Sequence, residues 1–123
     1  MVALKIGENQ YPLVLTVGAL DRLAQRGLTL DNLPEFISPK DKSYGEAVEN
    51  GLELLAILSE AAWDKAEMED KAHSDLPDLE LARLVLTPGQ VLGLCDAAII
   101  EGLTRRVEAD YTKNGESAEV ESP

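Results

Sequence analysis

Side chains that carry out chemistry are scarce in this sequence. Its 123 residues include one cysteine, Cys95, and one histidine, His73. A single cysteine excludes an internal disulfide and fits a reducing compartment. The N-terminus lacks the charged start and apolar run of a signal peptide, and no apolar stretch approaches the ~20 residues that cross a bilayer. We therefore predict a cytoplasmic protein.

Catalytic and metal-binding motifs are also missing. The sequence has no phosphate-binding glycine loop, no nucleophile elbow and no metal-spaced cysteine set. Asp70 and His73 have the spacing used in di-iron bundles, but such sites need a second pair, so a solvated loop histidine is the better interpretation. Cys95 falls on the inward face of a predicted helix, where a thiol acts as a small hydrophobe. We predict no enzyme activity, and no catalytic, cofactor-binding or metal-binding residues.

Basic residues are few, and this restricts the choice of partner. Twenty-three acidic residues against eleven basic ones give a formal net charge of -12. This charge repels phosphate backbones and anionic lipid surfaces, so we expect neither nucleic acid nor membrane as a partner. Two uses remain open: the charge keeps a sticky helical protein dispersed, or it attracts a basic protein.

Aromatic residues are rare, so the core must be aliphatic. Leucine and alanine dominate instead, and both favour helices. Residues 2–17 nevertheless alternate between apolar and other side chains on either side of Gly7–Gln10, which predicts two strands joined by a turn. The predicted fold is mainly α (α+β), with a small N-terminal β-hairpin packed on a helical domain that contains two longer helices.

The helix signals are strong. The expected helices cover about 17–26, 44–68 and 88–110. Thr16, Ser43 and Thr87 precede them as N-cap residues, Glu46 completes a capping box with Ser43, and Gly27 ends the first helix. A short helix near 79–86 has weaker support. We predict one globular domain over residues 1–111 and a disordered acidic tail over 112–123.

The helix over 44–68 carries its acidic residues in one narrow stripe. Helical spacing aligns Glu46, Glu49, Glu53, Glu60, Asp64 and Glu67. A solvated face is the plainer interpretation of this acidic stripe, and docking of a basic partner is the alternative, ahead of metal binding. Because most other directions around this helix are apolar, the helix is either central to the core or shared with a partner.

Some apolar side chains point away from the predicted core faces and are candidates for a partner interface. These are Leu54, Ile57, Ala61 and Trp63 of the long helix, and Ala97 and Ile100 of the last helix. Trp63 is the best single anchor, since tryptophan is enriched in interface hot spots. Either the hairpin and the connector cover these residues, or they form a groove for an amphipathic helix or for self-association as a homo-oligomer.

The opening segment also indicates a family. Residues 4–20, LKIGENQYPLVLTVGAL, resemble tail assembly chaperones of long-tailed phages, in which a short hairpin leads into a first helix. The acidic loop and the Leu86-Thr87-Pro88 entry to the last helix fit the same layout.

The resemblance implies a non-enzymatic chaperone without cofactor. It would bind and solubilise the helical tape measure protein in the host cytoplasm until tail tube subunits polymerise, and a longer product made by ribosomal frameshifting is common in such families. The alternative hypothesis is an acidic protein inhibitor or nucleic-acid mimic that binds a basic partner through the acidic stripe.

Overall fold

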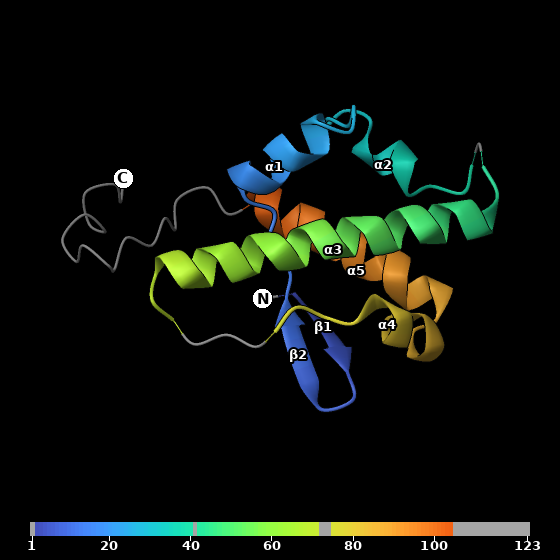
Figure 1. Cartoon of the computed structure of the whole chain (residues 1–123). Coiled ribbons are helices and arrows are strands. Elements are labelled where there is room, and N and C mark those ends of the chain that lie inside the picture. The colour runs from blue at the N-terminus through green and yellow to red at the C-terminus, as the bar shows by residue number, and fades with distance from the viewer. Residues whose placement is uncertain (1, 41, 72–74, 105–123) are drawn as a thin grey trace.

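The long helix α3 (Tyr44–Met68) runs through the middle of the fold, and the other elements pack around it (Figure 1). The computed structural model describes residues 2–40, 42–71 and 75–104. In chain order the remaining elements are β1 (Ala3–Ile6), β2 (Asn9–Pro12), α1 (Val17–Ala24), α2 (Leu33–Phe36), α4 (Leu79–Val85) and α5 (Pro88–Thr104). The fold is therefore mainly helical with an N-terminal antiparallel hairpin, as predicted.

The helices begin where their capping residues predict. The Ser43 hydroxyl accepts a hydrogen bond from the Glu46 amide at 3.1 Å, and α3 then runs over the expected 44–68. At the start of α5, the Thr87 and Gln90 side chains each accept from the other residue's amide, which is a complete capping box. The predicted end of this helix at 110 and the predicted tail over 112–123 lie outside the described residues.

The first helix is shorter at its end than predicted. Thr16 caps it as expected, by accepting from the Ala19 amide at 3.0 Å, but α1 ends at Ala24 instead of 26. Gly27 has a φ of 80°, and the amide of Leu28 binds back to the carbonyl of Leu23 at 2.9 Å. These are the features of a Schellman termination with Gly27 in the left-handed position, so Gly27 stops the helix as predicted and residues 25–27 form the turn that follows α1.

The hairpin turn is tighter than predicted, and the second strand lies earlier. Ile6 pairs with Asn9, so only Gly7 and Glu8 form the turn. Gly7 has a φ of 65°, and glycine at the first central position suits the two-residue turns that match strand twist. The predicted continuation of strand to residue 17 is wrong: β2 ends at Pro12, and the Val14 amide then donates to the Leu58 carbonyl of α3.

The core lies between α3 and the elements on its opposite sides. Figure 1 shows α1 and α2 on one side and the hairpin on the other, and contacts join α3 to α1, α2, α5 and β2. The closest approach to α5 is at Gly51, where an added Cβ would lie 2.8 Å from Val91 Cγ1. Leu54, Leu55 and Leu58 are fully buried in this core. The long helix is thus central to the core, which was one of its two predicted roles.

Candidate functional site

The acidic stripe of α3 is largely paired with arginines of the same chain, the first of which lies on α1. Arg22 reaches across from α1 and binds two stripe carboxylates, with its Nη1 2.9 Å from Glu60 Oε1 and its Nη2 2.6 Å from Asp64 Oδ2. Arg26, in the turn that follows α1, binds Glu53. Both arginines therefore reach α3 from this side of the fold.

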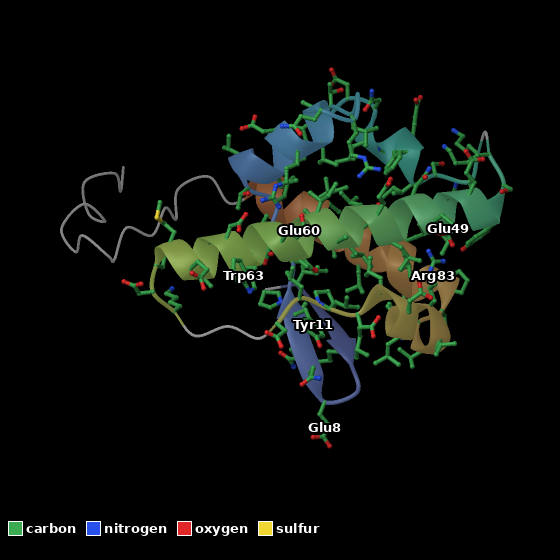
Figure 2. The ribbon with its side chains drawn as sticks, viewed as in Figure 1. Glu8, Tyr11, Glu49, Glu60, Trp63 and Arg83 are labelled. Atoms are coloured by element: carbon green, nitrogen blue, oxygen red, sulfur yellow. The ribbon has the colours of Figure 1, made fainter. Side chains whose placement is uncertain are left out.

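A third arginine binds the stripe from the other end of α3. Arg83 of α4 contacts both carboxylate oxygens of Glu49, and its Nη2 lies 2.7 Å from Oε1 (Figure 2). This hydrogen bond lowers the pKa of the Glu49 carboxyl below its ordinary value and raises the pKa of Arg83. The bidentate geometry is the one in which guanidinium and carboxylate match best.

The stripe therefore acts mainly within the molecule. Four of its six carboxylates, those of Glu49, Glu53, Glu60 and Asp64, bind an arginine of the same chain. The side chains in these pairs are about 40% to 55% exposed, so each pair contributes modestly to stability. Glu46 and Glu67 lie at the two ends of the stripe and are exposed. The positive charges that pair with the acidic stripe thus come from the same chain: from α1, from the turn after it and from α4.

Three of the predicted interface residues belong to the core. Leu54 is fully buried, and Ile57 and Ala61 are 7% and 5% exposed. The prediction that they form a partner surface is wrong, because α3 is covered by elements on several sides and its flank away from Leu52 and Leu55 is not free. Ala61 instead lines a hollow of about 230 Å³ beneath the start of α1, whose wall also includes the paired side chains of Arg22 and Asp64.

The other predicted interface residues keep some contact with solvent. Trp63 is half-buried near the last turns of α3 (Figure 2). Ala97 and Ile100 are exposed on α5, with Ile100 at 61%, and Leu103 lies exposed one turn after Ile100. We call Ala97, Ile100 and Leu103 the α5 face. Of the predicted interface residues, only Ala97 and Ile100 lie on an open apolar surface.

The segment just before α1 packs against the last turn of α5. Gly102 of α5 packs against Leu15, so closely that an added Cβ would lie 2.7 Å from Leu15 Cβ. Val17, two residues further on, is 75% exposed. Figure 1 shows this first turn of α1 beside the last turns of α5. The contact places a further exposed aliphatic side chain at this end of the molecule.

Sequence reasoning missed a second apolar surface, on α4. Leu81, Leu84 and Val85 are exposed there, with Leu84 at 81%. We call these three residues the α4 face. Their i, i+3, i+4 spacing is visible in the sequence, but the same spacing normally marks the buried side of a helix. Here the buried side is instead centred on Ala82, which is fully enclosed.

The single cysteine is not poised for nucleophilic chemistry. Cys95 is fully buried, and its thiol donates to the Gly51 carbonyl at 3.3 Å. Burial, helped by the nearby Asp96 carboxylate, raises the pKa of the thiol to about 12. In the described residues, no group of three or more histidine, cysteine and carboxylate side chains is arranged to hold a metal ion. His73 lies outside these residues.

Two further observations concern the chain as a whole. Among the helices described, none combines the length and apolar character needed to traverse a bilayer. No protein-family model, no curated protein and no solved structure matches this chain. Functional inference therefore depends on the surfaces above and on the resemblance noted in the sequence.

Proposed function

We propose that the protein is a non-enzymatic chaperone that binds an apolar helical segment of another protein. The observation that supports this most is the α5 face: Ile100 and Leu103 are exposed large aliphatic side chains on a chain of net charge -12. Exposed apolar patches of this kind bind other proteins. High net charge keeps the chaperone and its complex in solution.

The resemblance of the N-terminal segment to phage tail assembly chaperones indicates which protein the client is. On this proposal the client is the tape measure protein, the complex forms in the cytoplasm of the host cell, and tail tube subunits later replace the chaperone. The hairpin and the first helix, which carry the resemblance, both pack on α3. No catalytic residue or cofactor enters the proposal.

The alternative, an acidic inhibitor or nucleic-acid mimic, finds less support. Such a protein needs carboxylates that are free to meet a basic partner. Three arginines of this chain, Arg22, Arg26 and Arg83, already occupy four carboxylates of the acidic stripe. A basic partner would have to displace them first.

Co-expression with the tape measure protein of the same phage tests the proposal. The wild-type chain should bring the client into the soluble fraction as a complex, and Ile100→Asp should reduce that fraction. Tyr44→Asp is the matched control, because Tyr44 is 53% exposed at the distant start of α3 and the substitution adds the same charge. A client that is equally soluble without the chain, or with Ile100→Asp, would contradict the proposal.

A further inference from the structure

Helix α4 presents three different sides. Its inward side is centred on the buried Ala82, and the helix packs there against β1. A second side carries Arg83, which is bound to Glu49 of α3. The third side is the α4 face, where Leu81, Leu84 and Val85 are 43%, 81% and 51% exposed. One side of α4 is thus packed and a second side is ion-paired, yet the helix still exposes three large aliphatic side chains.

The α4 face has the geometry of a helix-packing surface. Side chains at i, i+3 and i+4 lie next to one another, so Leu81, Leu84 and Val85 form one continuous apolar strip. Such a strip is the kind of ridge that another helix covers with its own apolar side. Exposed leucines at this spacing are therefore better suited to a helical partner than to an extended strand.

The charges near the strip determine which charge a partner helix should carry. Asp75, Asp78 and Glu80 lie in the approach to α4 and its first turn, and all three are exposed. The cation on α4 itself, Arg83, is bound to Glu49, and its Nε lies 3.8 Å from Glu80. The N-terminal end of the strip is therefore acidic, and it is complementary to a helix that has lysine or arginine beside its apolar side.

A second copy of this chain is a poor occupant. It would bring the same acidic end of the strip and a further net charge of -12 to the contact. An anionic bilayer meets the same repulsion. The charges thus favour a basic amphipathic helix over both.

We propose that the α4 face is a second docking surface, separate from the α5 face, that binds a short basic amphipathic helix. Figure 1 shows α4 near the first half of α3, whereas the last turns of α5 lie beside the start of α1. The proposal does not depend on the tape measure protein being the client of the α5 face. A chain with both surfaces would join two partners, or grip one partner at two places.

Synthetic peptides test this proposal on the full chain. The probe is a peptide of about 14 residues with leucine on one helical side and lysine on the other, long enough for anchors at i, i+3, i+4 and i+7. Its controls are a peptide with glutamate in place of lysine and a scrambled peptide of the same composition. Calorimetry should detect binding of the first peptide only, and the affinity should fall as salt is added.

Neutral substitutions locate the site. Leu81→Ser with Leu84→Ser should weaken binding about tenfold or more, because two exposed anchors are lost without any change in charge. Met68→Ser at the end of α3 is the matched control and should leave the affinity within about twofold, since Met68 is 74% exposed and lies on neither the α4 face nor the α5 face. All these positions are exposed, so circular dichroism should show unchanged folding.

Three outcomes would overturn the proposal. The glutamate peptide could bind as well as the lysine peptide, or Met68→Ser could weaken binding as much as the α4 substitutions. Alternatively, sedimentation could show a dimer that Leu84→Ser dissociates, which would make a second copy the occupant. None of these outcomes bears on co-expression with the tape measure protein, so the two proposals fail separately.

Discussion

Arg83 of α4 and Glu49 of α3 are 34 residues apart in the sequence, yet their side chains meet as a bidentate ion pair. Helix α4 has only seven residues and one buried side chain, which packs toward β1. The pair adds a link from α4 to α3, and together with the packing on β1 it leaves the α4 face directed outward. An exposed ion pair thus helps to set the orientation of a proposed binding surface.

Removing this pair should loosen α4 locally. In Arg83→Met the aliphatic stem is kept but the bond to Glu49 is lost, so backbone amides of α4 should exchange with deuterium faster than in the wild type. Arg26→Met, which releases Glu53 from the turn after α1, is the control and should speed exchange in that turn and at the end of α1 instead. Equal exchange in α4 for all three proteins would show that packing on β1 alone fixes the helix.

The same pair predicts how stability depends on pH. The bond from Arg83 lowers the pKa of Glu49 below its ordinary 4.5, and bonds from Lys65 and then Lys71 lower that of Glu69. A carboxyl with a lowered folded-state pKa stabilises the fold fully above its unfolded-state pKa. That contribution is lost as the pH falls through the folded-state pKa.

The contribution of Glu49 should therefore disappear below about pH 4.5. Urea unfolding of wild type and Glu49→Gln at a series of pH values measures it as a difference, which removes the general effect of neutralising an acidic protein. The wild type should be the more stable at neutral pH, and the two should converge in acid. A gap that stays constant down to pH 3 would contradict the assignment of the lowered pKa.

The starts of α1, α3 and α5 were predictable because each depends on residues within one turn. Ser43, Thr16 and Thr87 each bind an amide three residues away, so the sequence alone contains both partners. The register of the hairpin was harder, since Tyr11 and Leu13 continue an alternating pattern past Pro12 although the chain leaves the sheet there. The alternation of apolar and polar residues does not show where a strand ends and the chain passes on to a helix.

The surfaces were less predictable, because they depend on which elements cover which sides of α3. Leu54 and Ile100 both lie off the predicted core faces of their helices, but α3 is enclosed and the end of α5 is not. Likewise, Arg22 finds Glu60 and Asp64 across 38 and 42 residues. Nothing in local spacing indicates that the stripe and the arginines meet.

Alanine substitutions should separate the buried from the exposed members of the predicted interface. Leu54→Ala removes a fully buried side chain and should cost about 2–5 kcal/mol of unfolding free energy. Ile100→Ala removes an exposed one and should change it by no more than about 0.5 kcal/mol. Urea unfolding measures both. Similar values for the two variants would mean that Ile100 is also covered.

Cys95 should be unreactive in the folded protein. Burial excludes reagents, and a thiol with a pKa of about 12 has almost no thiolate at neutral pH. A thiol-specific chromogenic reagent should therefore react slowly with the native chain and quickly in denaturant. Fast reaction under native conditions would mean that α5 separates readily from α3.

Two glycines of α3 should respond in opposite directions to alanine. Gly51 lies where α3 crosses α5, and a Cβ there would meet Val91 at 2.8 Å and Leu92 at 3.2 Å, so Gly51→Ala should cost about 1–3 kcal/mol of unfolding free energy. Gly45 has no atom within 4 Å of an added Cβ, so Gly45→Ala should gain about 0.5–1 kcal/mol through helix propensity alone. Chemical unfolding of the two variants compares the same substitution in the same helix. If Gly51→Ala also stabilised the protein, the close crossing of α3 and α5 would be wrong.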